Sequence, residues 1–309
     1  MKQRIRGVKF QEHFNQAQLF YNSLMPHEKA HLVSALSFEL SHCDDPDVYK
    51  SYTELLNNID FDLATKVAIN VNGVVPEKPA RTNHGKSSAS LSQEYFRPKN
   101  PTIVTRRIAI LVADGYNAVE VQTVRKALTN AKAVTWVIGP RRGRIDSGDH
   151  VSKNDEPIIA DSHFDGQRST LFDAVFIPSG ANHAKALLKS GRALHWIKEA
   201  FGHCKTIGAI GDGKELTCLL HYPTETPFVG VTVVKHAIGL SDVEFTDVGD
   251  NVVTSYGVVT TGNYSTVSAI TDLANIALDK GFVSKFIHEI SKHRCWEREL
   301  DGLTQMVAY

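Results

Sequence analysis

Hydrophobic residues follow two different patterns along the chain, and the change of pattern divides the chain into two parts joined by a linker. Over residues 10–73 they follow a helical period. In the stretch that begins at Pro26, the apolar positions of one helical face are Leu32, Val33, Leu36 and Leu40. Two more helices are predicted to begin at Asp45 and Asp60, because aspartate side chains accept hydrogen bonds from the first free amides of a helix. We therefore predict a small all-helical segment over residues 1–73.

Residues 74–103 lose the helical rhythm. The stretch "VVPEKPARTNHGKSSASLSQEYFRPKNPTI" contains prolines and serines and neither a helical nor an alternating pattern, which is typical of a linker. Its prolines favour a semi-extended tether. Tyr95 and Phe96 are unusual in a free linker, so a segment pinned across a surface is the alternative.

From Ile108 onward, short apolar runs alternate with helical stretches. The runs "IAILVADG", "VTWVIGP", "FDAVFIPSG" and "KTIGAI" predict strands. The stretches between and after them, "AVEVQTVRKALTNA", "ALLKSGRALHWIKEAFGHC" and "VTTGNYSTVSAITDLANIALDKGF", predict helices. Continuous apolar strands between helices indicate a parallel sheet that is covered on both faces. Residues 104–309 are thus predicted to be a doubly wound α/β domain, with any site at the carboxyl ends of its strands.

Composition and charge exclude several classes of protein. The 309 residues carry 34 Lys and Arg against 34 Asp and Glu. Nucleic-acid binding usually requires an excess of basic residues, so no nucleic acid is expected as a partner. No apolar run reaches the length of a membrane-spanning helix, so no membrane partner is expected. The opening "MKQRIRGVKFQEHF" lacks the apolar core of a secretory signal and is typical of a chain entered in mid-course. The compartment, cytoplasmic or secreted, stays open.

The four cysteines are widely spaced. Cys43, Cys204, Cys218 and Cys295 form no CxxC pair, which argues against a structural zinc site and a disulfide-stapled scaffold. Whether these thiols are buried, free or redox-sensitive is left open by the sequence. Asn263 begins the only glycosylation sequon, "NYS", which matters only in a secreted protein.

Two catalytic motifs are rejected. "HEKAH" places His27 and His31 on one helical face, as in zinc proteases, but no third ligand follows and the intervening residues are those of a solvated helix surface. No metal is therefore expected. The turn "GAIGDG" lacks the GxGxxG spacing of a dinucleotide site, and no phosphate-binding GxxxxGK[ST] loop occurs.

The α/β segment resembles a known superfamily. "RRIAILVADGYNAVEVQTVRKALTNAKAVTWVIGPRRGRI" and "LFDAVFIPSGANHAKALLKSGRALHWIKEAFGHCKTIGAIGDGKELT" are similar to the PfpI-like branch of the class I glutamine amidotransferases. The resemblance implies a flavodoxin-like fold, a cysteine nucleophile at the turn after a strand, a glutamate that hydrogen-bonds it, and an oxyanion hole of glycine amides. Glu120 matches the glutamate, and Ser179 and Gly180 match the paired glycines.

The nucleophile itself is missing. Gly211 stands where the cysteine belongs, and a hydrogen atom cannot attack a carbonyl group. Asp212 follows it, but a carboxylate without a nucleophile is weak support for a reaction. Glu120, Ser179, Gly180, Gly211 and Asp212 are therefore interpreted as vestigial positions, and no catalytic or cofactor-binding residue is expected in this chain.

The helical segment carries a second resemblance. "KFQEHFNQAQLFYNSLMPHEKAHLVSALSFELSH" with "LLNNIDFDLATKVA" is similar to the C-terminal helices of haem catalases. Helices, linker and a cysteine-less PfpI-like domain, in this order, are the architecture of large-subunit catalases. The resemblance implies a parent that decomposes hydrogen peroxide with haem, as a homotetramer. The haem domain would lie outside this chain, so the chain alone is expected neither to bind haem nor to act as an enzyme.

Three functions remain open for this chain. The first is a structural brace that packs on the catalase core of its own parent and stabilises the tetramer. The second is a holdase-like chaperone that binds unfolding client proteins through exposed apolar surface. The third is residual hydrolase or glyoxalase-like activity at Glu120 and Asp212.

Overall fold

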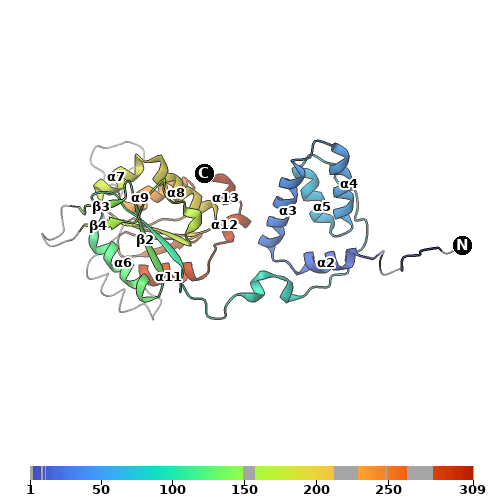
Figure 1. Ribbon diagram of the computed structural model, residues 1–309, viewed down its shortest axis with the longest axis horizontal. Coiled ribbons are helices and arrows are strands. Elements are labelled where there is room, and N and C mark those ends of the chain that lie inside the picture. Colours follow the sequence, from blue (N-terminus) through green and yellow to red (C-terminus); the bar gives the residue numbers. More distant parts are fainter. Residues whose placement is uncertain are drawn as a thin grey trace. The chain divides into compact units, whose positions relative to one another are not determined.

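The computed structural model describes residues 3–7, 10, 12–148, 157–211, 229–247, 249–262 and 281–308. The chain divides into two compact units, Met1–Lys99 and Asn100–Tyr309 (Figure 1). The first is helical, and the second is a sheet with helices on both faces.

The described part of the first unit contains four helices, α2 (Phe14–Ser23), α3 (Pro26–Leu40), α4 (Pro46–Asn57) and α5 (Phe61–Asn70). The two predicted aspartate caps are confirmed, because the Asp45 carboxylate accepts from the Asp47 amide and that of Asp60 from the Leu63 amide. The core gathers apolar residues of all four helices: Tyr21, Val33, Leu40, Leu56, Leu63, Ala64 and Val67.

Residues after α5 run along the helical unit and contain two short 3₁₀ turns, η1 (Ala89–Leu91) and η2 (Gln93–Phe96). Arg81 forms a two-pronged ion pair with Glu12, with distances of 2.7 and 2.9 Å. Glu28 of α3 accepts from the Ser92 hydroxyl and the Gln93 amide, each at 2.9 Å. This segment is therefore fastened to the helices by polar contacts.

The second unit contains a seven-stranded sheet in the order β5-β2-β1-β6-β7-β9-β8. All pairs are parallel except β8–β9. The strands are β1 (Arg107–Leu111), β2 (Val134–Gly139), β5 (Ser162–His163), β6 (Ala174–Ile177), β7 (Thr206–Ile210), β8 (Val252–Ser255) and β9 (Val258–Thr261). A separate hairpin joins β3 (Gly143–Ile145) to β4 (Ile158–Ala160).

Helices cover both faces of the sheet (Figure 1). One face is packed by α7 (Ala181–Leu188), α8 (Gly191–Gly202) and α9 (Gly230–Ile238). The other is packed by α6 (Ala118–Asn130) and α11 (Phe282–Ser291). The turn η3 (Ser169–Leu171) precedes β6, and the short helices α12 (Glu297–Leu300) and α13 (Leu303–Met306) follow α11. The central strands β6 and β7 are completely buried, as two covered faces require.

The predicted fold class is confirmed: a doubly wound, mostly parallel α/β sheet follows an all-helical segment. The predicted helix over 259–282 is wrong at its start, because Val259–Thr261 belong to β9. A β-branched run there pairs with β7 on one side and β8 on the other. Residues 263–280 of that prediction lie outside the described residues. No described helix is both long and apolar enough to cross a bilayer.

Candidate functional site

The carboxyl edge of the sheet, where β1 and β6 lie side by side, is the place where this architecture puts its ligands. The chain leaves β1 toward β2 and later returns to β6 on the other side. Glu120 lies in the first turn of α6, Ser179 and Gly180 directly follow β6, and Gly211 directly follows β7. Asp212, the fifth predicted position, lies outside the described residues.

Glu120 and Ser179 are brought together. Asn117 caps α6 by accepting from the Val119 and Glu120 amides, which fixes the turn that carries Glu120. The Glu120 carboxylate is 2% exposed. It accepts from the Ser179 amide at 2.7 Å, the Ser179 hydroxyl at 2.6 Å and the Asn117 side-chain amide at 3.1 Å. The carboxylate thus holds the loop after β6 in place.

Gly180 closes the space between the two strand ends. Its φ of 133° is one that side-chain-bearing residues rarely adopt. A Cβ there would lie 2.2 Å from the carbonyl oxygen of Gly115, in the loop after β1. The Asn117 amide also donates to the Ser179 carbonyl at 3.0 Å. The loops after β1 and β6 are therefore in direct main-chain contact.

Gly211 is equally enclosed. Its amide donates to the Thr261 carbonyl at 2.7 Å, which continues the pairing of β7 with β9. A Cβ at this position would lie 2.9 Å from the carbonyl oxygens of both Asp247 and Gly262, closer than real Cβ atoms approach. A cysteine could not occupy position 211 unless one of these segments moved.

The start of α9 covers the neighbouring part of the same edge. A Cβ on Gly230 would lie 2.5–2.8 Å from the carbonyl oxygens of Ile177, Pro178 and Ile210. Only glycine allows the helix to sit this close to the ends of β6 and β7. At Gly180, Gly211 and Gly230, neighbouring main chain therefore fills the space that a side chain would need.

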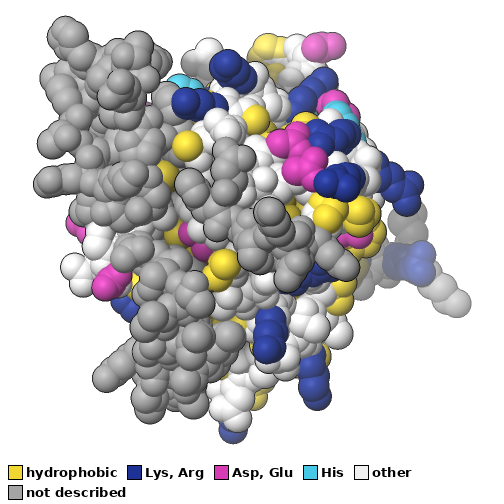
Figure 2. All heavy atoms as spheres, turned by 90° about the vertical axis from the view of Figure 1, so that its left-hand side faces the viewer, with side chains coloured by type: hydrophobic (Ala, Val, Ile, Leu, Met, Phe, Trp, Pro, Cys, Tyr) yellow, Lys and Arg dark blue, Asp and Glu magenta, His cyan; other side chains and the backbone are white. Residues whose placement is uncertain are grey.

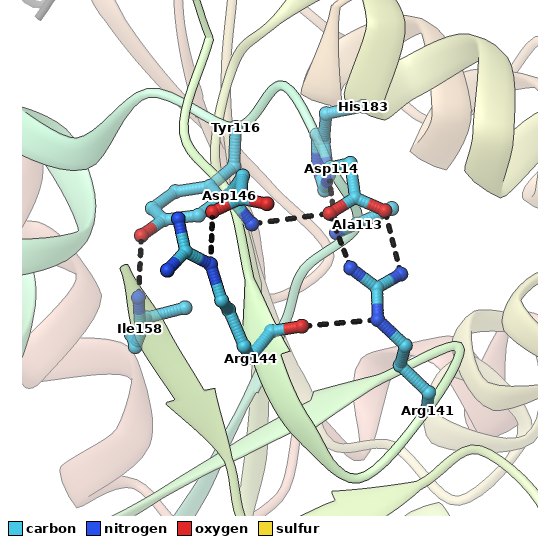
Figure 3. A network of polar contacts seen from close by, with 8 residues as sticks. All are labelled: Ala113, Asp114, Tyr116, Arg141, Arg144, Asp146, Ile158 and His183. Atoms are coloured by element: carbon cyan, nitrogen blue, oxygen red, sulfur yellow. Dashed lines mark hydrogen bonds and ion pairs between the residues drawn. The ribbon is translucent and has the colours of Figure 1, made fainter. Parts of the chain in front are cut away.

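An arginine clamp fastens the loop after β1 (Figure 3). The Arg141 guanidinium donates twice to the Asp114 carboxylate, both at 2.6 Å, and once to the Arg144 carbonyl. The hydrogen bond from Arg141 outweighs partial burial and lowers the pKa of Asp114. Asp146 joins the clamp, because its amide donates to Asp114 and its carboxylate accepts from Arg144 at 2.7 Å.

His183 was missed by sequence reasoning. Its ring is fully buried on α7, and Nδ1 accepts from the Ala113 amide at 2.9 Å (Figure 3). Burial, partly offset by hydrogen bonds with the main chain of Ala113 and Pro178, lowers the pKa of His183 to about 4. The ring is neutral near pH 7. The sequence pattern that could have predicted its burial is its position beside Ala184 and Leu187 on the apolar face of α7.

The histidines of "HEKAH" have other surroundings than a metal site requires. Glu28 caps α3 by accepting from the Met25 amide and also holds the linker. The His27 and His31 rings stand edge to face, 6.1 Å apart. Within the residues that the structure describes, no three His, Cys, Asp or Glu side chains gather as a metal site would need.

Comparison with known families decides the identity. The family described as "C-terminal domain found in long catalases" matches residues 104–299, and "Catalase-related immune-responsive" matches residues 8–71. The chain belongs to the long-catalase family. It corresponds to the C-terminal region of a long catalase, and the predicted resemblance to large-subunit catalases is confirmed.

Several catalases align over the whole chain. It is 43% identical to Catalase-1 of Neurospora crassa and 42% identical to Catalase A of Aspergillus fumigatus, each over 100% of this chain. It is 37% identical to Catalase HPII of Pseudomonas aeruginosa over 77% of the chain. The chain spans 39% of the length of each of the two fungal relatives and the matched part 33% of the bacterial one.

Proposed function

We propose that this region is a non-catalytic module of a long catalase, whose helical unit packs against the rest of the subunit and stabilises it. The carrying observation is the uneven distribution of exposed apolar side chains. Of the large hydrophobic residues that are exposed in the described chain, fourteen lie in Met1–Lys99 and six in the larger α/β unit. Six of the fourteen lie on helices α2 to α5, and the other eight lie in the segments before, between and after them.

The six on helices are spread over all four of them. Phe38 on α3 is 62% exposed and Ile69 on α5 is 63% exposed, and Phe20 and Leu55 are nearly half exposed. Burying apolar surface stabilises by about 25 cal/mol per Å². Such side chains are expected where a further part of the protein covers them.

The α/β unit presents a different surface. Figure 2 views it from the side of the β3–β4 hairpin, and the apolar side chains on the described part of that face form small groups among charged and polar ones. This mixture is typical of a surface that faces water.

The packing at the carboxyl edge supports the absence of a reaction. Glu120 is engaged by Ser179 and Asn117, and position 211 has no space for a nucleophile. We therefore propose neither hydrolase nor glyoxalase-like chemistry there. Turnover of a small dicarbonyl that disappears in Glu120→Gln would overturn this part of the proposal.

The reaction of the whole protein belongs to the part outside this chain. The curated relatives are catalases, so we propose that the parent decomposes hydrogen peroxide with haem as a homotetramer. We assign the haem to the remaining part of a long catalase.

The experiment compares whole subunits. Phe38→Ser with Ile69→Ser should lower the temperature at which the assembled enzyme loses peroxide-decomposing activity, because both side chains would be buried in the assembly. Val134→Ser with Leu171→Ser is the matched control, since these residues are similarly exposed but lie in the α/β unit. Equal inactivation temperatures for the two double variants and the parent would refute the packing proposal.

A holdase-like activity is the second candidate, and the same exposed surface favours it. The free chain should then suppress light scattering by a heat-labile client enzyme at near-stoichiometric ratio, and the Phe38 and Ile69 double variant should suppress it less. An inert globular protein at equal mass is the control. If the free chain does not suppress aggregation, the brace alone remains.

A further inference from the structure

The C-terminal tail of the α/β unit is fastened to the sheet by one buried side chain. Arg298 of α12 is fully buried and donates to the carbonyls of Phe201, Lys205 and Tyr256, at the end of α8, the start of β7 and the β8–β9 turn. Its guanidinium also lies 4.3 Å from the centre of the Phe201 ring. The tail and the amino edge of the sheet therefore meet at this arginine.

Arg298 leaves one nitrogen without a partner. Its Nη2 is buried and makes no hydrogen bond within the described structure. Nη2 and the Cys295 sulfur both lie within 3.4 Å of the point where a Cβ of residue 257 would stand, and Gly257 has none. A buried cationic nitrogen thus lies close to a cysteine sulfur.

Cys204 occupies a backbone position that favours glycine. Its φ is 55°, and it follows α8 in the left-handed conformation that ends many helices. The Cys204 amide donates to the Phe201 carbonyl and the Lys205 amide to the Ala200 carbonyl, which is the hydrogen-bond pattern of a Schellman motif. A residue with a side chain is strained here, so helix termination gives no reason for a cysteine.

Cys204 and Cys295 meet at the start of α12. The Cys295 amide donates to the Cys204 carbonyl at 2.8 Å, so the main chains of the two cysteines are in direct contact. The Cys204 thiol interacts with the backbone of Glu299 and the Cys295 thiol with that of Arg298. Two successive residues of one helical turn therefore lie against the two sulfurs.

We propose that Cys204 and Cys295 form a disulfide when the protein meets a peroxide, and that this bond locks the C-terminal tail onto the sheet. Cys295 is half-buried and Cys204 is buried, so Cys295 reacts first. The Cys295 thiol donates to the Glu297 carboxylate at 3.2 Å, a contact that favours the protonated thiol. This inference does not depend on the proposed bracing role.

The step is balanced with one peroxide. The Cys295 sulfur attacks a peroxide oxygen, the O–O bond breaks, and water leaves as Cys295 becomes a sulfenic acid. The Cys204 thiol then attacks the oxidised sulfur, the S–S bond forms, the S–O bond breaks and a second water leaves. Two thiols are oxidised to one disulfide, and one peroxide is reduced to two waters.

Burial sets the rate at which this happens. Desolvation raises the pKa of Cys204 to about 11 and that of Cys295 to about 12, although Arg298 opposes both shifts. Thiols react as thiolates, so the pair is slow compared with a peroxide sensor. A slowly formed bond that then persists is a structural bond.

The test uses the full chain. The protein is reduced, freed of reductant, exposed to hydrogen peroxide, blocked with a thiol-alkylating reagent and digested with trypsin without reduction. The two cysteines fall in the tryptic peptides 199–205 and 295–298. We expect these peptides to be joined and two hydrogens lighter than their sum. Oxidation should also raise the unfolding temperature by on the order of 10 °C.

Matched variants separate this bond from other oxidations. Cys43→Ser should keep both the joined peptides and the temperature shift. Cys204→Gly should abolish both while remaining folded, because glycine suits the left-handed position, and Cys295→Ser should abolish the joined peptides. Recovery of both peptides in alkylated or singly oxidised form, or of either one joined to a Cys43 or Cys218 peptide, would overturn the proposal.

Discussion

Gly180, Gly211 and Gly230 each lie where a Cβ would come within 3 Å of a main-chain oxygen. Each is at the carboxyl end of a central strand or packs directly on one. At the scale of single residues, the absence of a side chain is what lets the loops and α9 close over the edge of the sheet.

Introducing a cysteine at position 211 should destabilise the protein and yield no nucleophilic activity. In Gly211→Cys the new Cβ would press on the carbonyls of Asp247 and Gly262, and overpacking of this kind costs roughly 1–3 kcal/mol. Urea unfolding of the full chain measures the change. Gly191→Ala is the control, because a Cβ at the start of α8 meets open space. Unchanged stability in Gly211→Cys would show that the enclosing segments yield.

His183 should make the protein less stable in acid. Its pKa is about 4 in the folded chain against about 6.5 when unfolded, so the unfolded state binds more protons between these values. The stabilisation is complete above pH 6.5 and is lost as the pH falls toward 4, a change of about 3 kcal/mol. Denaturant unfolding from pH 7 to 4 measures it.

His183→Asn is the matched variant, because its amide oxygen can accept from the Ala113 amide but does not titrate. The stability of the variant should fall less between pH 7 and 4. Parallel pH profiles for the two proteins would refute the assignment to His183.

At the scale of helices and strands, the local hydrophobic pattern was enough to predict the strands that are buried on both faces. The apolar runs at β1, β2, β6 and β7 were recognised, and so was the amphipathic α6. The stretch predicted as helical over 186–204 covers the end of α7 and the whole of α8. The short edge elements β3, β4 and β8 were not predicted, because their pairing partners determine them more than their own residues do.

Only those parts of the candidate site that short sequence motifs carry could be predicted from the sequence. The resemblance matched Glu120 to a glutamate that hydrogen-bonds a cysteine at position 211, whereas its contact with Ser179 comes from the structure alone. The enclosure of Gly211 depends on Asp247 and Gly262, which lie far along the chain, so no local pattern could reveal it. The catalytic silence of the chain and the role of Asp212 stay predictions.

Glu28 fastens the part of the linker around η2 to α3. Its carboxylate accepts from the Met25 amide, the Ser92 hydroxyl and the Gln93 amide. Burial alone would raise the pKa of Glu28, but these hydrogen bonds outweigh it and lower that pKa. The contact is therefore weakened in acid, when the carboxylate is protonated.

Glu28→Ala should expose the linker to proteases. Trypsin should cut after Lys86 and Lys99 several times faster, because the backbone near η2 loses its two bonds to α3. Timed digestion of the folded chain, read by mass spectrometry, gives the rates. Glu39→Ala on the exposed side of α3 is the control. Equal cleavage rates in both variants would mean that other contacts hold the segment.

At the scale of the whole molecule, the two units differ in how much apolar side-chain surface they leave exposed. The helical unit leaves large apolar side chains in water, whereas the α/β unit buries two extensive apolar layers against its sheet. The chain spans 39% of the length of its fungal relatives. This difference supports the proposed packing of the helical unit against the rest of a long catalase.

The free chain should bind a hydrophobic fluorescent dye through its helical unit. Phe38→Ser with Ile69→Ser should lower the fluorescence clearly, because both side chains are more than 60% exposed. Val134→Ser with Leu171→Ser should lower it less. A larger loss of dye fluorescence in the second variant would place the dye-binding surface on the α/β unit.

The enclosure of Gly211 also constrains how this sequence can change over generations. A lineage that acquires any larger residue there must also displace the segment of Asp247 or the chain at Gly262. Selection meets one substitution at a time, and each first step gives a less stable protein. Selection against the less stable variants is therefore enough to keep glycine at this position, without any reaction to select for it.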